Sequence, residues 1–152
     1  MAITSAICNT FKTEVLKAVH NFTASSGNTF NLALYTSSAT LSKSTTAYAT
    51  NPGGGGDTEI TNTSGSAYSP KGKALTSVTP VLSTDTAVCD FADISWTSAS
   101  FTANGCLIFN DSASGDPAVC AIAFGSDKTV TSGTFTVQFP TADASDAIIR
   151  IA

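Results

Sequence analysis

Residues 133–140, GTFTVQFP, alternate apolar and polar side chains without a break, and this pattern constrains the fold more than any other. Phe135, Val137 and Phe139 share one face, whereas Thr134, Thr136 and Gln138 share the other. A period of two is the spacing of a β-strand with one buried face. Six further segments are short, apolar or partly alternating, and bounded by polar turns: 30–36, 73–83, 86–96, 99–111, 117–125 and 146–152. Seven such strands predict a mainly β chain folded as an antiparallel, jelly-roll-like β-sandwich.

Two of these strands contain irregular positions. Pro80 has no N–H for a sheet ladder, so 73–83 is expected to be an edge strand or a broken strand. In 86–96 the alternation slips at 92–95, ADIS, which predicts a β-bulge there. The sole tryptophan and three phenylalanines are expected in the core of the sandwich: Trp96, Phe91, Phe101 and Phe109.

The N-terminal segment has the period of a helix instead. Its apolar residues recur at steps of three and four, which is one face of an amphipathic helix: Ile7, Phe11, Val15, Ala18, Val19 and Phe22. We predict a helix over 5–21, capped by Thr4 or Ser5 and ended by the Gly-containing turn ASSGN. Phe11, Val15 and Phe22 are expected to be buried, either on the sandwich or on a neighbouring chain.

Length and charge narrow the class of protein. At 152 residues the chain is expected to form one domain, 1–152. Charged residues make up 12%, the net charge is −4, and no run of basic residues forms a stripe, which argues against nucleic acid as a partner. No segment is long and apolar enough to span a membrane. The hydroxyl-rich, Lys- and Glu-poor composition fits a protein that contacts other proteins, since interfaces are depleted in Lys and Glu.

The four cysteines, Cys8, Cys89, Cys106 and Cys120, predict neither a zinc site nor a redox motif. They lack a CxxC spacing, and a single histidine does not complete a zinc site with them. The N-terminal segment lacks the basic start and unbroken apolar core of a signal peptide. We therefore expect synthesis in the cytosol and four free thiols that pack as small apolar side chains. The even number leaves two disulfides formally possible.

No motif in the chain predicts catalysis or a cofactor, and we expect the protein not to be an enzyme. Gly72 and Lys73 lack the glycine spacing of a phosphate-binding loop, and a predicted strand follows them rather than a helix. His20 is expected at the end of the helix, facing the helix carbonyls or solvent.

Two pairs of carboxylates are candidates for a calcium site. They are Asp90 with Asp93, and Asp111 with Asp116. Neither pair matches a regular calcium loop, so turn or surface carboxylates are the simpler interpretation.

A long Gly-, Ser- and Thr-rich stretch, residues 50–73, is the strongest candidate for a functional segment. It contains four consecutive glycines, which are costly to order, and it is too long for a tight hairpin. We predict a flexible arm that contacts another protein and can add a strand to the partner's sheet edge, with Ile60, Tyr68, Lys71 and Lys73 at the interface. The alternative is a surface loop without a partner.

The order of several segments resembles a known family. The segments are MAITSAICNTFKTEVLKAVHNF, FNLALYTSSATL, DFADISWTSASFTANG, AFGSDKTVTSGTFTVQFP and AIIRIA. Over nearly the whole chain, this succession resembles small virion structural proteins of tailed bacteriophages.

The resemblance implies assembly rather than catalysis. It suggests a capsid cement or decoration protein that binds the major capsid protein shell in many copies, as a homo-oligomer without a cofactor. Such a protein is made in the host bacterial cytoplasm and resides in the virion. The alternative is a neck, tail or tail-fibre component. A carbohydrate-binding module needs an exposed aromatic cluster and a hydrolase needs an acid–base pair, and the sequence pattern predicts neither.

Overall fold

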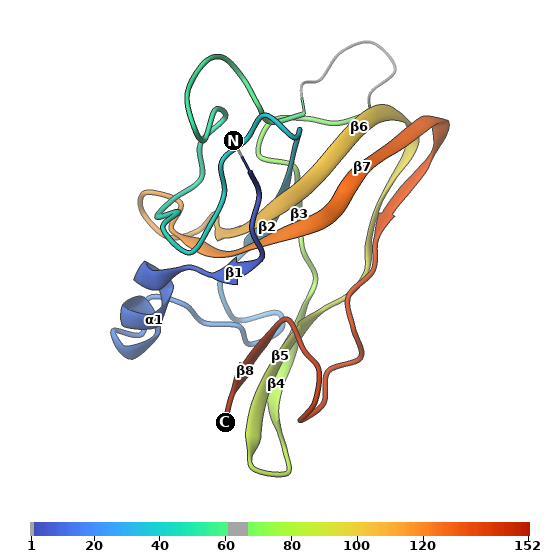
Figure 1. Cartoon of the computed structure of the whole chain (residues 1–152). Helices are drawn as coiled ribbons and strands as arrows, with labels where there is room; N and C mark the ends of the chain where they lie inside the picture. The colour runs from blue at the N-terminus through green and yellow to red at the C-terminus, as the bar shows by residue number, and fades with distance from the viewer. Residues whose placement is uncertain (1, 61–66) are drawn as a thin grey trace.

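The computed structural model describes residues 2–60 and 67–152, which form a mainly β, sandwich-like fold with antiparallel sheets and one short helix, as the sequence predicts. One sheet has five strands in the order β1-β7-β6-β2-β3, and the other has three in the order β4-β5-β8 (Figure 1). The elements in chain order are β1 (Ala6–Ile7), α1 (Asn9–Leu16), β2 (Phe30–Tyr35), β3 (Lys73–Ala74), β4 (Ser77–Ser83), β5 (Thr86–Phe91), β6 (Ile94–Asn110), β7 (Ala118–Val137) and β8 (Ile149–Ile151).

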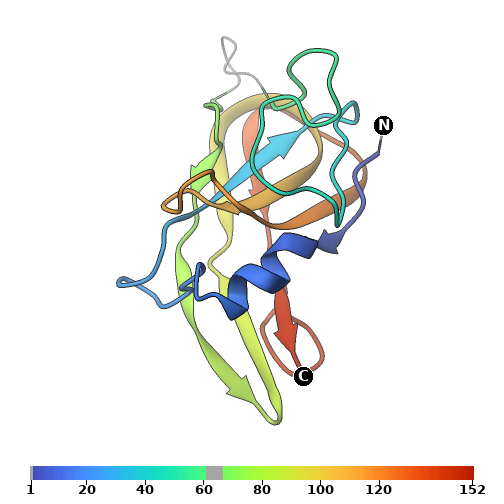
Figure 2. The same ribbon diagram turned by 90° about the vertical axis from the view of Figure 1, so that its left-hand side faces the viewer.

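A long hairpin of β6 and β7 forms the centre of the five-stranded sheet. The segments 117–125 and 133–140, predicted as two strands, belong for the most part to the single strand β7. The strand continues because it bends without leaving the ladder: its pairing with β6 shifts register at several points, and Gly125 and Ser132 adopt positive φ angles of 78° and 46°. Register shifts of this kind curve a strand. The hairpin therefore curls back on itself (Figure 2).

The irregularity predicted at 92–95 is a switch between the two sheets rather than a bulge. The chain leaves β5 at Phe91 and enters β6 at Ile94, in the other sheet. The N–H of Ala92 donates to Thr76 O at 3.0 Å, and the carboxylate of Asp93 accepts from Phe139 N at 2.9 Å. These bonds hold the corner between the sheets.

Pro80 lies on an edge strand, as the sequence predicts. The segment 73–83 is broken into β3 and β4, and β4 forms an edge of the three-stranded sheet. The pairing of β4 with β5 shifts register between Val78 and Val81, on either side of Pro80. A proline is tolerated on an edge strand because the side that faces solvent has no ladder that needs its N–H.

The helix is shorter than predicted, spanning Asn9–Leu16 instead of 5–21. The preceding residues Ala6 and Ile7 pair with β7, so the sheet rather than the helix satisfies their backbone. The N-cap is Cys8, without a side-chain cap hydrogen bond, and not Thr4 or Ser5. Ala18 adopts a φ of 56°, which ends the helical path.

One contiguous apolar core joins both sheets and the helix. Of the residues expected there, Phe11, Phe91, Trp96 and Phe109 are buried, and others pack against the core while partly exposed: Val15, Phe22 and Phe101. The aromatic rings contact one another within this core, as Phe22 and Phe30 do at 4.3 Å between centroids.

All four cysteines are free and buried, in agreement with the expected apolar packing. Burial, with a smaller contribution from Glu14, raises the pKa of the Cys8 thiol to about 11. Burial, with a smaller contribution from Asp90, raises the pKa of the Cys89 thiol to about 12. Burial also raises the thiol pKa values of Cys106 and Cys120. These thiols therefore stay protonated near neutral pH and pack as apolar groups.

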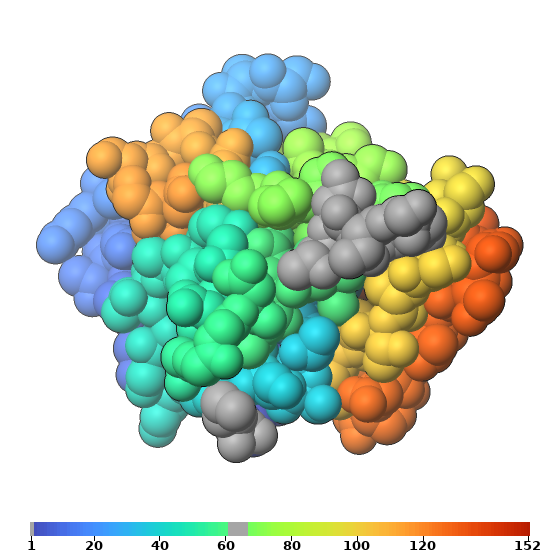
Figure 3. Space-filling model, turned by 90° about the horizontal axis from the view of Figure 1, so that it is seen from above, coloured from blue at the N-terminus to red at the C-terminus, as the bar shows by residue number. Residues whose placement is uncertain are grey.

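The described part of the predicted arm, residues 50–60 and 67–73, is tied to the body of the chain rather than extended from it; residues 61–66 lie outside the described residues. Thr50 O accepts from the N–H groups of Thr58 and Glu59, both at 2.9 Å, and Pro52 O accepts from Thr40 N at 2.8 Å. This segment lies on the end of the molecule seen in Figure 3, where it is coloured green.

Candidate interaction surface

Glu59, which belongs to the described part of the predicted arm, is the centre of a buried polar cluster. Its carboxylate accepts hydrogen bonds from the hydroxyl groups of Tyr48 (2.6 Å) and Tyr68 (2.7 Å) and from the N–H of Lys71 (2.7 Å). Burial raises the pKa of the Glu59 carboxyl, and the three donors oppose this shift because they stabilise the charged form. The Tyr68 hydroxyl also accepts from the N–H of Leu34 at 2.9 Å, so the cluster fastens both flanks of the segment to β2.

Lys71 connects this buried cluster to two carboxylates at the surface. Its Nζ lies 2.8 Å from Asp116 Oδ2 and 2.9 Å from Asp111 Oδ1. The hydrogen bonds to Asp116 and Asp111 raise the pKa of the Lys71 ammonium. The lysine therefore lies between the two carboxylates that the sequence offers as a calcium candidate.

The second candidate pair is engaged by the backbone. Asp90 accepts from the N–H of Phe91 at 2.8 Å, and Asp93 accepts from that of Phe139. Within 2–60 and 67–152, no three His, Cys, Asp or Glu side chains gather in a way that could hold a metal ion. Within the same residues, no helix is long and apolar enough to cross a membrane.

The four residues predicted at an interface lie in different environments. Ile60 (5% exposed) and Tyr68 (0%) are buried, and both hydrogen-bond to Leu34, Ile60 through its backbone N–H. The expectation that these two side chains are free to anchor a partner is wrong, because the chain's own core covers them. Lys71 is partly exposed but held by two aspartates, and Lys73 is exposed and donates to a carbonyl of β6 at 2.8 Å. An interface role for the two lysines stays a prediction.

The side chain of His20 is buried and does not face solvent or the helix carbonyls as expected. Its Nε2 lies 2.9 Å from Glu14 Oε2, and its Nδ1 lies 3.1 Å from the amide nitrogen of Asn110. The Asn110 amide oxygen already accepts from Ser112 and Ala113, so its nitrogen faces the ring. This arrangement places the imidazole proton on Nε2, which donates to Glu14. His20 thus links the end of α1 to β6 as a structural residue.

Exposed apolar side chains gather on the three-stranded sheet. Five large apolar side chains are exposed among the described residues, and four of them lie on this sheet: Val78, Val81 and Leu82 on β4, and Ile151 on β8. We call the three residues on β4 the β4 apolar patch. Val81 is 60% exposed and Leu82 is 70% exposed. The hairpin that β4 forms with β5 projects away from the five-stranded sheet (Figures 1 and 2), and Thr84 and Asp85 form its turn.

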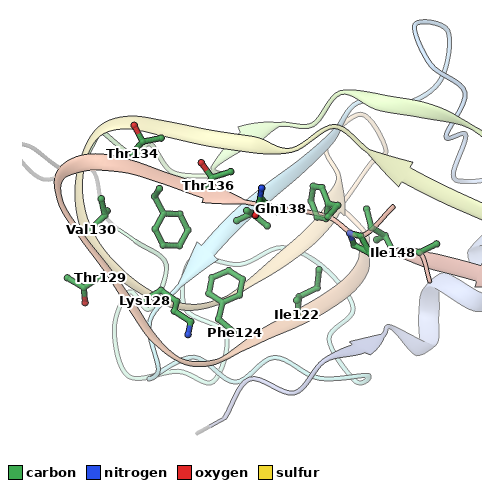
Figure 4. Close-up of a pocket in the computed structure, with 14 residues that line it drawn as sticks. Ile122, Phe124, Lys128, Thr129, Val130, Thr134, Thr136, Gln138 and Ile148 are labelled. Atoms are coloured by element: carbon green, nitrogen blue, oxygen red, sulfur yellow. The ribbon is translucent and has the colours of Figure 1, made fainter. Parts of the chain in front are cut away.

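A second apolar feature lies on the concave side of the bent strand β7. The two halves of the strand and the segment after it line a groove of about 690 Å³, which we call the β7 groove (Figure 4). Ile122 and Phe124 lie on one side of it and Gln138 on the other in this view. Lys128 is the single charged residue among those that line the groove.

No family model, curated protein or solved structure matches the chain. Inferences about function therefore depend on the residues of the chain itself.

Glu59, the β4 apolar patch and the β7 groove are the features that the sequence patterns did not predict. Glu59 follows Asp57 and Thr58, two polar residues that give no sign of burial. The patch does have a sequence signal, since Val81 and Leu82 are consecutive in a predicted edge strand and adjacent residues of a strand point to opposite faces. The groove depends on the bend of β7, which links segments that look like separate strands.

Proposed function

We propose that this chain is a structural subunit of a bacteriophage virion, namely a capsid cement or decoration protein that binds and stabilises the major capsid protein shell. The proposal assigns it no catalytic role and no cofactor. It combines the sequence resemblance to small virion proteins with the surface of the β4–β5 hairpin. A position in the neck, tail or tail fibre is the alternative outcome of the test below.

The observation that carries this proposal is the concentration of exposed apolar side chains on one small sheet. Four of the five large exposed apolar residues lie on β4 and β8, and β4 is exposed over most of its length. Isolated exposed apolar residues are ordinary, whereas a group of them on one element is typical of a protein contact surface. The projecting hairpin gives this surface access to a concave partner.

The energy available from this patch suits a subunit that is present in many copies. Fully burying a Val or Leu side chain contributes about 1.5–3 kcal/mol. Three such residues give a weak contact once the cost of association is included. Repetition over a symmetric shell compensates for a weak contact, because linked sites bind with high avidity.

Electron microscopy of purified particles tests the proposal. An antibody against the recombinant chain is detected with gold label on particles purified from infected host cells by density gradient. We expect label on the capsid shell. Label on the neck, tail or fibres supports the alternative, and particles without the chain by labelling and mass spectrometry contradict both.

A pair of matched variants connects the test to the patch. Val81→Ser with Leu82→Ser removes two exposed apolar side chains of β4, and we expect it to fold but to be lost from particles. Leu16→Ser removes an apolar side chain that is even more exposed, but on α1. We expect Leu16→Ser to be incorporated like the wild type, and equal loss of both variants would show that the patch has no special role.

A further inference from the structure

We propose, building on the assembly role above, that one partner of this chain is a second copy of itself, whose β4–β5 hairpin inserts its tip into the β7 groove. The tip and the groove are both apolar, both are uncovered within one chain, and each carries one charge of opposite sign. The contact is heterologous, since two different surfaces of the molecule meet.

The shape of the tip favours a groove over a flat surface. Val81 and Leu82 are neighbours on β4, so their side chains point to opposite faces of the strand. A flat partner covers one of these faces and leaves the other in water. A groove encloses the strand from both sides and buries both residues.

The size and lining of the groove fit this occupant. Its volume of about 690 Å³ lies within the range of protein pockets that enclose a drug-sized ligand. A ligand of that size is larger than two aliphatic side chains, so the groove also has room for the turn that follows them. Its apolar lining includes Ile122, Phe124, Val130, Phe135, Phe139 and Ile148. Phe124 and Phe135 face each other across the bend of β7, with ring centroids 6.2 Å apart.

The charges at the two surfaces complement each other. Lys128 is exposed at the groove and donates to Ser126 Oγ at 3.0 Å, and it has no salt bridge within the described residues. Asp85 is exposed in the turn of the hairpin, three residues after Leu82, and likewise has no salt bridge within them. Docking of the tip brings a carboxylate beside the one cation that lines the groove, which fixes the orientation of the contact.

A repeated contact of this kind joins copies head to tail. Each chain offers one tip and one groove, so copies form a ring where the rotation closes and an open chain where it does not. A single tip buries less surface than a standard stable interface, so we expect self-association to be weak and to appear at high protein concentration.

Charge reversal tests the contact with exposed residues whose replacement leaves the core intact. Sedimentation velocity over a concentration series measures self-association of the full chain. We expect Asp85→Lys alone and Lys128→Asp alone to weaken it at least several-fold, and an equimolar mixture of the two variants to restore it, because every cross-contact then joins opposite charges. Leu82→Ser is expected to weaken it by at least about 10-fold. Lys43→Asp, an exposed charge change elsewhere, serves as the control and is expected to associate like the wild type.

Several outcomes overturn the inference. A wild-type chain that stays monomeric at every concentration contradicts it, as does a mixture of the two charge variants that fails to associate. Self-association that Leu82→Ser leaves unchanged contradicts it as well. Particle labelling is a separate measurement. If the chain is present in virions but does not self-associate, only this inference is overturned. If the chain self-associates but is absent from virions, only the proposed function is overturned.

Discussion

Replacing Tyr68 with phenylalanine removes one hydroxyl group from the buried cluster around Glu59 and leaves the aromatic ring in place. This hydroxyl donates to the Glu59 carboxylate at 2.7 Å and accepts the N–H of Leu34 at 2.9 Å. A hydrogen bond to a charged group contributes about 1.5–3 kcal/mol, and a buried N–H without a partner costs about 1–3 kcal/mol. We therefore expect Tyr68→Phe to lower the free energy of unfolding by about 2.5–6 kcal/mol. This is a large share of the roughly 5–15 kcal/mol that stabilises a typical domain.

Urea denaturation at mildly alkaline pH, followed by Trp96 fluorescence and by far-UV circular dichroism, measures this loss. Tyr35→Phe is the matched control, because Tyr35 is equally buried but its hydroxyl donates to a neutral acceptor, the carbonyl oxygen of Ala49, at 2.8 Å. We expect this control to lose about 0.5–1.5 kcal/mol. Equal losses in the two variants, or a loss below about 1 kcal/mol for Tyr68→Phe, would refute the assigned strength of the cluster.

Three further predictions concern the helix, the buried carboxyl and one glycine. Phe11→Ala is expected to lower the free energy of unfolding by about 3–5 kcal/mol, because its side chain is only 3% exposed. Leu16→Ala on the same helix is expected to change it by less than about 0.5 kcal/mol, because that side chain is 88% exposed. Similar losses for the two variants in calorimetry would contradict this prediction. The stability of the wild type relative to Glu59→Gln is expected to be greatest below the ordinary carboxyl pKa of 4.5 and to fall as pH rises through the raised pKa of the folded state. The reason is that the folded state binds this proton more tightly than the unfolded state does. Denaturation across a pH series measures this difference, and a relative stability that rises with pH would show that folding lowers the pKa of Glu59 instead. Gly72→Ala is expected to lower the melting temperature far more than Gly55→Ala does. Both glycines have a positive φ, but only at Gly72 would an added Cβ overlap a carbonyl oxygen of β2. Equal melting temperatures for the two variants would argue against this close packing.

Local patterns in the sequence predict which segments are strands, but they do not predict how the segments join. The alternation at 133–140 and the apolar run at 117–125 both correspond to strand, and Pro80 marks an edge. That the first two belong to one bent strand depends on pairing with β6 across the hairpin, which a local pattern does not contain. The helix is overestimated for the same reason, since Ile7 fits the helical period but pairs with Cys120, far along the chain.

The environment of the candidate interface residues was harder to predict than the strands. A segment rich in glycine and hydroxyl residues is typical of a solvated loop, and this interpretation placed Ile60 and Tyr68 at the surface. Their burial follows from contacts with β2 and from the carboxylate of Glu59, whose three donors come from positions 48, 68 and 71. A carboxylate satisfied by three donors from two separate parts of the chain leaves no periodic signal in the sequence.

Pro80 has a consequence for the solubility of newly made chains. An exposed edge strand that also carries apolar side chains is the combination that promotes uncontrolled strand addition and amyloid-like growth. At the centre of β4, Pro80 offers no N–H, and the register shift between Val78 and Val81 distorts the edge on both sides of it. A foreign strand adding to this edge therefore loses ladder hydrogen bonds where they are most needed. The proline thus opposes backbone-mediated aggregation while leaving the side chains of β4 available for specific contacts.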